Sequence, residues 1–438
     1  MSIIEDLEER GVLKDKTNGI SDFIKNNDIN IYCGTDPTAD SLHVGHLIPI
    51  ITLLRLKKSG INNKVTFLIG GATGMIGDPS FKSAERTFLE QDKIKQNTIG
   101  IENQVKRLFK DNNCDVNIVN NSDWYSNMNV IDFLREGKLL TVNYMSAKES
   151  VKKRIVDGMS FTEFSYQLLQ GYDFYHLYEK YGVNIEMGGA DQWGNITSGI
   201  DFIRKKINKE VHGFTIKLLT KSDGAKFGKT EGGCIWLDKT KTSPYEFYQF
   251  WINQSDDDII NLIKIFSLKD LDDINSLIEE HLRCPQKHLL QKTLAEEMLE
   301  LIHGKDEKDK CVKISEIIFE NSDFNEIKNI DGIKDNLKNI ENITISKLEL
   351  KDCKTYYDLL SKTCVANTCE DNSVEKCVDK LFSSKSELKR AIVNNSVSVN
   401  KKKITSEDEE FINDDIFSYE FMLVQNGKKN YFVVFFVD

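Results

Sequence analysis

Two short segments far apart in the chain carry side chains suited to holding the phosphates of a nucleotide. The first is His43-Val44-Gly45-His46 and the second is Lys226-Phe227-Gly228-Lys229-Thr230. Imidazole, ammonium and hydroxyl groups donate hydrogen bonds to negative charge. A reaction that breaks ATP between its first and second phosphates needs such donors around the departing pyrophosphate. Together the segments predict a phosphate clamp, although neither is specific alone.

The two histidines have alternative interpretations as metal ligands or as core residues with satisfied ring nitrogens. No nearby carboxylate or cysteine completes a tetrahedral set, so we expect no zinc site. Pro49 follows three residues after His46, and proline within a helix suits only the first turn. We therefore expect the histidines at a helix N-terminus, where the helix dipole favours an anion.

A polar stripe marks a second candidate site. The run from Ser160 to Glu163 matches a capping box and predicts a helix that continues to about residue 181. Tyr166, Gln170 and Asp173 then share one face, because they stand at positions i, i+4 and i+7. A solvated stripe is the alternative, but aromatic and leucine neighbours leave little room for a wet helix. We infer a ligand whose ammonium group contacts Tyr166 and Gln170 and whose hydroxyl proton Asp173 accepts.

Residues 70–78 form a glycine-rich turn that ends in Asp78. The glycines allow backbone to approach a ligand closely, and Asp78 stands where it can meet a cation. The turn lacks the Gly-Lys-Ser or Gly-Lys-Thr ending of a P-loop. A plain tight turn remains the competing interpretation.

Short apolar runs in the first half of the chain predict the elements that position these groups. Strands are expected at residues 29–33, 65–69, 116–119 and 185–187, with helical patterns between them, which is typical of α/β units around a parallel sheet. The four turns that follow lie at residues 34–37, 70–74, 120–123 and 188–191. Ligands of such sheets bind beyond the carboxyl ends of the strands, so these turns should border one crevice.

The length of 438 residues predicts several domains. We expect an α/β catalytic domain over residues 1–244, a helical domain over 245–320, a weakly structured linker over 321–350 and a last domain over 351–438. The net charge of −11 argues against a uniform nucleic-acid coat. Residues 381–405 nevertheless carry six Lys or Arg against Glu387, a local +5 that suits RNA phosphates unless these are ordinary solvated lysines.

The cysteines and the N-terminus bear on the compartment. The nine cysteines include no C-x-x-C pair, so a disulfide framework or structural zinc site is not expected, and Cys364, Cys369 and Cys377 are interpreted as plain thiols. Residues 1–10 are acidic, unlike a targeting peptide, and no run of 18 apolar residues predicts a membrane span. A reducing, cytoplasmic location is expected, with an organelle as the alternative.

The motifs taken together resemble one family. His43 to His46 is similar to the HIGH signature of class I aminoacyl-tRNA synthetases, and Lys226 to Thr230 to their KMSKS loop in the form typical of bacterial-type tyrosyl-tRNA synthetases. The similarity is dense over about residues 1–310 and extends to the segments 32–34, 36–42, 70–80, 161–173, 191–195 and 243–248. The ensemble is far more specific than the first signature alone, which other nucleotidylyl transferases share.

The resemblance implies a role for each matching residue. The substrate phenol would meet Tyr32 and Asp173, its ammonium group would meet Asp78, Tyr166 and Gln170, and its carboxylate would lie by Gln192. The remaining assignments concern ATP: Cys33, Gly34, Asp36, His46, Gly189 and Asp191 on the adenosine side, Thr38 and His43 at the γ-phosphate, and Lys82, Arg86, Lys226, Lys229 and Thr230 at the pyrophosphate.

The last part of the chain resembles an S4-type RNA-binding domain. Residues 384–390 and 397–401 carry this similarity, which implies RNA contacts from Lys385, Lys389, Arg390 and Lys401. The family usually has glycine where this chain has Lys401, and Thr230 replaces the serine of the general KMSKS form.

The implied fold is a Rossmann-like parallel-sheet domain followed by a helical domain and a small α+β S4-like domain. The implied reaction activates tyrosine with Mg-ATP, without a metal held by the protein, and then transfers it to tRNA(Tyr) on a homodimer. The nearest alternative is the tryptophanyl relative, against which Tyr32 and Asp173 favour a phenol over an indole. A non-catalytic RNA-binding or splicing protein on the same fold is the other alternative.

Overall fold

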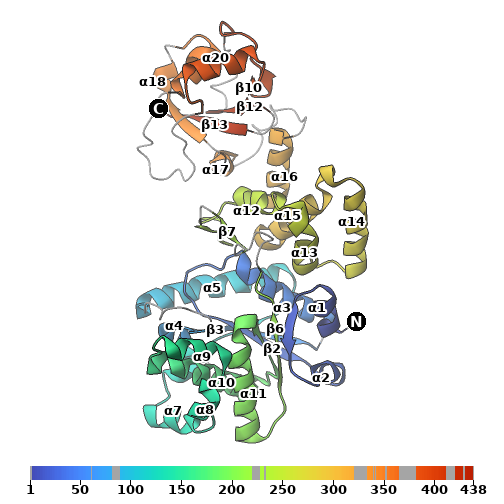
Figure 1. Cartoon of the computed structure of the whole chain (residues 1–438), viewed down its shortest axis with the longest axis vertical. Coiled ribbons are helices and arrows are strands. Elements are labelled where there is room, and N and C mark those ends of the chain that lie inside the picture. Colours follow the sequence, from blue (N-terminus) through green and yellow to red (C-terminus); the bar gives the residue numbers. More distant parts are fainter. Residues whose placement is uncertain are drawn as a thin grey trace. The chain divides into compact units, whose positions relative to one another are not determined.

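The computed structural model describes residues 2–60, 62–80, 89–219, 227–230, 233–319, 333–338, 340, 342–350, 353–364, 381–410, 420–427 and 430–437. These form two compact units (Figure 1). The first contains Met1–Thr242 and Phe250–Gly304, and the second contains Ser243–Gln249 and Lys305–Asp438. None of the described helices combines the length and apolar character that crossing a membrane requires. The division into functional segments at residues 244, 320 and 350 stays a prediction.

A six-stranded sheet forms the centre of the first unit. Its order is β1-β6-β5-β2-β3-β4, and all neighbours are parallel except β1 and β6. The strands are β1 (Leu13–Lys16), β2 (Asn30–Thr35), β3 (Lys64–Ile69), β4 (Asn117–Asn120), β5 (Ile185–Gly189) and β6 (His212–Ile216). The chain moves outward from β2 through β3 to β4 and returns to β5 on the other side of β2. The strand order therefore reverses between β2 and β5, the place where open α/β sheets bind ligands.

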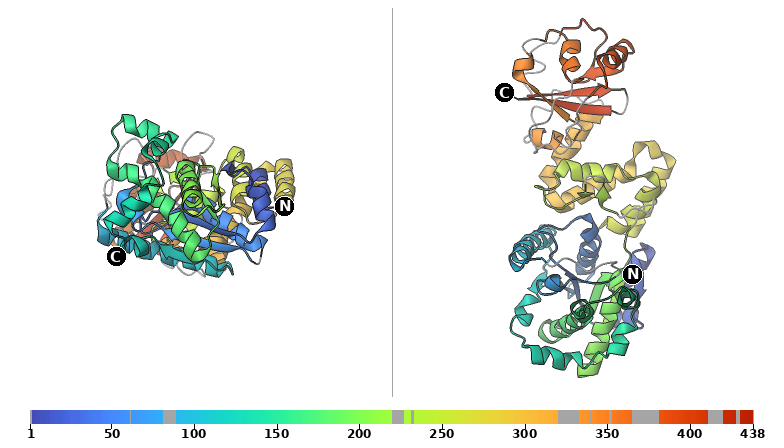
Figure 2. Two further views of the ribbon diagram at one scale, coloured as in Figure 1. Left: turned by 90° about the horizontal axis from the view of Figure 1, so that it is seen from below. Right: turned by 60° about the vertical axis from the view of Figure 1, so that its left-hand side comes forward.

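Helices lie on both faces of this sheet, as Figures 1 and 2 show. On one side are α3 (Leu47–Ser59) and α5 (Gln91–Asp111), and on the other are α10 (Phe161–Tyr181) and α11 (Trp193–Ile207). The predicted strands and the helix after residue 160 are confirmed to within a few residues. The Ser160 hydroxyl caps α10 by accepting a hydrogen bond from the Glu163 amide, while the Glu163 carboxylate forms a buried ion pair with Arg154.

Shorter elements complete the unit. They are α1 (Ile3–Glu9), α2 (Ile20–Asn26), α4 (Thr73–Ile76), α6 (Ser122–Tyr125), α7 (Val130–Gly137), α8 (Val142–Ser146), α9 (Glu149–Val156), the 3₁₀ turns Val44–His46, Ala190–Gln192 and Pro285–Lys287, and the hairpin β7 (Lys229–Thr230) with β8 (Gly233–Cys234). The helical part of the unit consists of α13 (Asp256–Phe266), α14 (Leu271–Arg283) and α15 (Leu289–His303).

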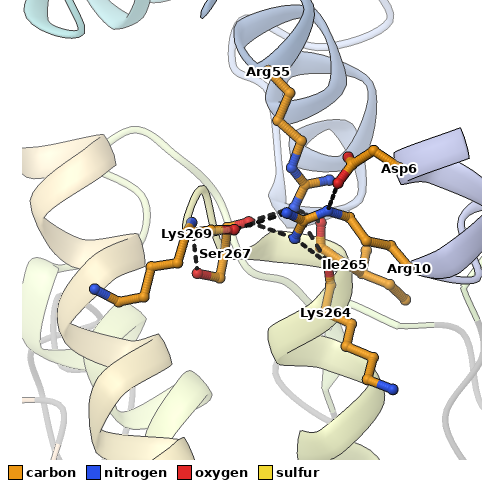
Figure 3. A network of polar contacts seen from close by, with 7 residues as sticks. All are labelled: Asp6, Arg10, Arg55, Lys264, Ile265, Ser267 and Lys269. Carbon is orange, nitrogen blue, oxygen red and sulfur yellow. Dashed lines mark hydrogen bonds and ion pairs between the residues drawn. The ribbon is translucent and has the colours of Figure 1, made fainter. Parts of the chain in front are cut away.

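Two buried arginines attach α13 to the sheet domain (Figure 3). Arg10, just after α1, donates hydrogen bonds to the carbonyls of Lys264, Ser267 and Lys269, and its Nε lies 2.7 Å from the Asp6 carboxylate. Arg55 on α3 donates to the carbonyls of Lys264, Ile265 and Ser267. Helix C-termini leave carbonyls without intrahelical donors, and cations complement their dipole. Burial, and then the neighbouring Arg10 charge, lower the pKa of Arg55 to about 9.

The second unit is built around a five-stranded sheet of order β11-β10-β12-β13-β9. Its strands are β9 (Asn342–Ser346), β10 (Val397–Val399), β11 (Lys402–Lys403), β12 (Phe421–Asn426) and β13 (Asn430–Val437). Its helices include α16 (Lys305–Phe319), α17 (Ile333–Leu337), α18 (Lys347–Leu350), α19 (Tyr356–Lys362) and α20 (Lys385–Val393), while α12 (Pro244–Ile252) begins in this unit and ends in the first.

Part of the expected linker is ordered. Residues 342–350 form β9 and α18, and β9 pairs in parallel with β13. Ile343 and Ile345 alternate into the hydrophobic core of the unit, which explains why this segment joins the sheet. Residues 320–332 lie outside the described residues.

Candidate functional site

A cavity of about 560 Å³ opens at the carboxyl edge of the first sheet, where β2 and β5 diverge. The walls come from the ends of these strands, the His43–His46 segment, the turn after β3 and α10. The residues expected from the sequence that line the cavity are Tyr32, Cys33, Gly34, Asp36, Thr38, His43, His46, Asp78, Tyr166, Gln170, Asp173, Gly189, Asp191 and Gln192. Three of the four predicted turns border it. The fourth, residues 120–123, does not line the cavity, and its Asn121 instead donates to Asp173.

Asp173 lies at the buried end of the cavity with donors on both carboxylate oxygens. Asn121 Nδ2 donates to Oδ2 at 3.1 Å, and Trp124 Nε1 donates to Oδ1 at 2.9 Å. Burial raises the pKa of Asp173 to about 7, and these donors lower it by stabilising the charged form. The site thus presents a buried acceptor held in place by two donors, an arrangement suited to a ligand hydroxyl.

Glu186 on β5 is a second buried carboxyl at this end of the cavity. Gln170 Nε2 donates to its Oε1 at 2.9 Å. An amide whose nitrogen is directed to a carboxylate has its oxygen facing elsewhere, so the Gln170 oxygen is available to a ligand ammonium group. Burial raises the pKa of Glu186 to about 7, as it does for Asp173.

Three further carboxylates surround the middle of the cavity. Tyr166 Oη donates to Asp36 Oδ2 at 3.0 Å, and Thr73 Oγ1 donates to Asp36 Oδ1 at 2.8 Å. Gln192 Nε2 donates to Asp78 Oδ2 at 2.7 Å and to Asp191 at 3.1 Å. Carboxylates at this density favour a cation, which agrees with the predicted ammonium end of the ligand. In this structure Tyr166 contacts Asp36, which the resemblance assigned to the adenosine side.

The two histidines hold defined tautomers. His43 Nδ1 accepts a hydrogen bond from the Gly45 amide at 3.0 Å, and His46 Nδ1 accepts one from the His43 amide at 3.2 Å. Because each neutral ring then carries its proton on Nε2, each is a donor at that atom. Burial lowers the pKa of His46 to about 3, so this ring is neutral at physiological pH. His43 caps the 3₁₀ turn Val44–His46, which leads directly into α3, confirming the expected place of the histidines at a helix N-terminus.

The two signatures lie against each other. Residues 42–44 and 235–237 run side by side: the Val44 amide donates to the Ile235 carbonyl at 3.0 Å, and the Leu237 amide donates to the Leu42 carbonyl at 2.8 Å. The Ile235 amide in turn donates to the Gly228 carbonyl at 3.1 Å. A short backbone ladder therefore connects the first signature to the second.

Gly228 of the second signature lies directly against Val44 of the first. It has φ +81°, and a Cβ at this position would lie 2.3 Å from Val44 Cγ2. The next residue back, Phe227, lines the cavity and packs its ring against Phe250, Trp251 and Phe266. The second signature is thus attached to the helical part of the same unit.

Several expected phosphate ligands cannot be placed. Lys82, Arg86 and Lys226 lie outside the described residues, and only the backbone of Lys229 and Thr230 is described, in β7. Within the described part of the chain, no group of three His, Cys, Asp or Glu side chains could hold a metal.

The basic residues of the second unit occupy α20 and the following hairpin. Lys389 pairs with Glu407 at 2.9 Å, and Arg390 Nε donates to the Ser386 carbonyl. Asn400 and Lys401 connect β10 to β11 with φ values of +46° and +67°. Such two-residue hairpin turns favour glycine, which accounts for the usual family residue at the position of Lys401.

Sequence reasoning missed three residues at the buried end of the cavity: Asn121, Trp124 and Glu186. Asn121 follows β4, and the sequence marks that turn only as a border of the crevice. Glu186 stands in the run Ile185-Glu186-Met187, where it interrupts a buried parallel strand. An acid in such a strand is the pattern that identifies it, because buried charges need partners.

Comparison with known proteins gives consistent matches over the whole chain. A family model described as class I tRNA synthetases (W and Y) matches residues 25–320, and one described as the tyrosine–tRNA ligase SYY-like C-terminal domain matches residues 363–434. The tyrosine–tRNA ligase of Mycoplasma mycoides subsp. mycoides SC is 47% identical over 99% of both chains, and that of Flavobacterium johnsoniae is 44% identical over the same shares. A C-terminally truncated mitochondrial tyrosyl-tRNA synthetase of Aspergillus nidulans superposes with a TM-score of 0.65 at 32% identity, covering 72% of this chain and 93% of the other.

Proposed function

The chain belongs to the class I tRNA synthetases, within the tyrosine–tRNA ligases, and we propose that the cavity between β2 and β5 is its active site. A tyrosine–tRNA ligase joins tyrosine to ATP as tyrosyl-adenylate, releases pyrophosphate, and transfers the tyrosyl group to the 3′ end of tRNA(Tyr). The observation that carries the assignment of the site is Asp173, a buried carboxyl with two donors behind it at the closed end of the cavity.

Tyrosine binds in this proposal with its ring toward α10 and its hydroxyl between Tyr32 and Asp173. The ammonium group lies among Asp78, Tyr166 and the oxygen of Gln170, and the carboxylate lies by Gln192. A substrate that lacks the hydroxyl leaves Asp173 and Tyr32 buried without their ligand. Tyrosyl-tRNA synthetases are the known example of this effect, and their discrimination of about 10⁵ against phenylalanine is a value established for that class of enzyme, not one inferred from this cavity.

ATP lies toward the carboxyl ends of β2 and β5 and the two signatures. The tyrosine carboxylate is already a nucleophile and attacks the α-phosphorus, so no covalent enzyme intermediate is required. Catalysis then consists of positioning and of donors to the developing charge: the Nε2–H groups of His43 and His46 on one side, and the second signature on the other. We propose that Mg²⁺ accompanies the nucleotide on its phosphate oxygens.

The first test removes the carboxyl that meets the phenol. Asp173→Ala should abolish tyrosine-dependent ATP–pyrophosphate exchange, whereas Asp123→Ala, an exposed acid in the neighbouring α6, should leave it unchanged. Exchange with tyrosine, with tryptophan and without amino acid separates the two substrate classes of the family. Unchanged exchange in Asp173→Ala would contradict the assignment of the cavity.

The second test separates the clamp from the pocket. His43→Ala, or Lys226→Ala combined with Lys229→Ala, should slow adenylate formation far more than it weakens tyrosine binding, because these groups contact phosphates in the transition state. Pre-steady-state kinetics and equilibrium tyrosine binding provide the two measurements. A defect confined to binding would count against the clamp.

A homodimer is proposed from exposed apolar side chains on the helices between residues 130 and 161. Val130, Ile131 and Leu134 on α7 are 72%, 60% and 54% exposed, while Phe133 packs into the core. Val142, Val156 and Phe161 add exposed apolar side chains on α8, α9 and α10. Surfaces of this kind mark protein interfaces. Sedimentation should show a dimer that Ile131→Lys with Leu134→Lys dissociates, whereas Leu282→Lys, an exposed leucine on α14, should not.

Transfer RNA recognition by the second unit is proposed from its basic residues. Lys385, Lys389, Arg390 and Lys401 lie on α20 and the β10–β11 turn. Replacing all four with Glu should raise the KM for tRNA and reduce its salt dependence, while tyrosine-dependent pyrophosphate exchange stays unchanged. An unchanged KM for tRNA would remove this surface from the proposal.

A further inference from the structure

Two polar atoms at the closed end of the cavity lack hydrogen-bond partners of ordinary geometry among the described residues. They are the hydroxyl of Tyr32 and Oε2 of Glu186, and both are fully buried. The two residues are register partners on the adjacent strands β2 and β5. After burial itself, the Glu186 charge is the main cause of the raised pKa of Tyr32. Buried polar atoms without partners are costly, so their occurrence together requires an explanation.

The two carboxyls at this end of the cavity have different surroundings. Asp173 has a donor on each oxygen, from Asn121 and Trp124. Glu186 has the Gln170 amide on Oε1 only. The charged form of Asp173 is therefore better stabilised than that of Glu186.

The elements packed against Glu186 supply no compensating cation among the residues described. The titratable groups that face it are Tyr32 and Cys33 on β2 and Asp173 on α10. From β6 its register neighbour is Gly213, and α11 presents Gly199, where a Cβ would lie 3.2 Å from Glu186 Oε2. Two like charges so close together disfavour the ionisation of both carboxyls.

We propose that Glu186 is a positioning residue that keeps a proton on Oε2 and donates a hydrogen bond through it to the hydroxyl oxygen of Tyr32. The Tyr32 hydroxyl then donates to the phenol oxygen of bound tyrosine, and the phenol donates to the Asp173 carboxylate. The hydrogen bonds run in one direction from Glu186 to Asp173. This inference rests on the proposed function of the cavity and adds the residue that orients its phenol end.

One hydrogen bond between Glu186 Oε2 and the Tyr32 hydroxyl would satisfy both orphan atoms. Only the protonated carboxyl makes it as the donor, which leaves the Tyr32 proton available to the substrate phenol. An ionised Glu186 would instead accept a hydrogen bond from the Tyr32 hydroxyl, which would keep its proton but direct it away from the substrate. The substrate phenol, with one proton, would then face two acceptors, Asp173 and the oxygen of Tyr32. Tyrosine binding should weaken accordingly when Glu186 loses its proton.

The test compares tyrosine affinity of the full-length wild type with Glu186→Gln and Glu186→Leu between pH 6.5 and 8.5. Glutamine permanently mimics the protonated acid: its oxygen accepts from Gln170, and its amide nitrogen donates to Tyr32. The ratio of the wild-type Kd to the Glu186→Gln Kd should rise by roughly 10- to 30-fold across this range, because the loss of one proton weakens binding about tenfold for each pH unit above the pKa of Glu186, about 7. Both proteins share the ionisation of the substrate amine, so the ratio removes its contribution and reports the ionisation of Glu186 together with its coupling to Asp173. Glu186→Leu should bind tyrosine weakly at every pH, and rescue by glutamine but not leucine separates positioning from volume.

Infrared difference spectroscopy supplies an independent readout. Subtracting the Glu186→Gln spectrum from the wild type at pH 6.5 should reveal a protonated carboxyl band that Glu179→Gln, an exposed acid on α10, does not remove. A constant Kd ratio, or the absence of that band, would overturn the proposal. If the wild type showed no tyrosine-dependent pyrophosphate exchange, the proposed function of the cavity would be refuted instead, so the two failures are distinguishable.

Discussion

The close contact between Gly228 and Val44 restricts position 228 of the second signature to glycine. Gly228→Ala introduces a Cβ at 2.3 Å from Val44 Cγ2 and also strains a φ of +81°. The loop must move, so we expect adenylate formation to slow at least tenfold while tyrosine binding is retained. Gly233→Ala is the matched control, because that glycine has φ +113° in the same hairpin but no atom within 4 Å. Equal defects in single-turnover assays would attribute the effect to backbone strain alone.

Trp124 is one of the donors that stabilise the charged form of Asp173. Trp124→Phe removes the donor to Asp173 Oδ1 and keeps an aromatic ring against His176. Because that donor stabilises the carboxylate, its loss raises the pKa of Asp173 above its present value of about 7. Tyrosine affinity should therefore fall most near pH 6.5 and recover toward pH 8.5. A loss of equal size at all pH values in titration calorimetry would contradict this role.

Residues of this site can be predicted from the sequence where several polar side chains lie on one helix or in one short motif. Tyr166, Gln170 and Asp173 follow from helical spacing, and the histidines follow from their place before Pro49. Glu186 was not predicted, because its neighbours read as an ordinary buried strand. Its function depends on Gln170 and Tyr32, which reach it only through the fold.

At the scale of elements, the hydrogen bonds of Arg10 and Arg55 to the carbonyls at the end of α13 predict an effect on stability (Figure 3). Arg55→Met leaves the terminal carbonyls of α13 with fewer donors in a buried setting and should lower the free energy of unfolding by about 2–4 kcal/mol. Arg135→Met removes an exposed arginine 3.9 Å from Asp132 and should change it by less than about 1 kcal/mol. Chemical denaturation measures both. Equal small effects would show that Arg10 alone suffices for the junction.

Elements were predictable where the hydrophobic period was long, as in α10, or where an apolar run ended in a turn, as in β2, β3 and β5. The ladder between residues 42–44 and 235–237 was not, since neither segment carries a strand pattern by itself. β9 was missed for a similar reason. Its two isoleucines stand among Asn, Ser and Thr, and only pairing with β13 identifies them as a strand.

For the whole molecule, the buried carboxyls predict how stability depends on pH. Glu186 has a folded-state pKa of about 7, raised by burial, so the folded chain keeps a proton that the unfolded chain releases above about pH 4.5. Stability contributed by this group is therefore lost as pH rises toward 7 and beyond. Glu186→Gln should be more stable than wild type at pH 8, by about 1–3 kcal/mol, with the advantage shrinking toward pH 4.5. Thermal or urea unfolding at the two pH values checks the sign, and an advantage that grows on acidification would contradict it.

The short ladder that joins residues 42–44 to residues 235–237 also constrains the order of events during synthesis. When only the first 200 residues have left the ribosome, the chain contains the strands β1 to β5 but lacks the segment 235–237 that pairs with residues 42–44. Contacts between such distant segments form late, because closing a long loop costs entropy before any contact offsets it. Nucleotide binding should therefore appear only after the second signature and the segment 235–237 have been synthesised. A series of nascent chains of increasing length should bind ATP only once residue 237 has left the ribosome.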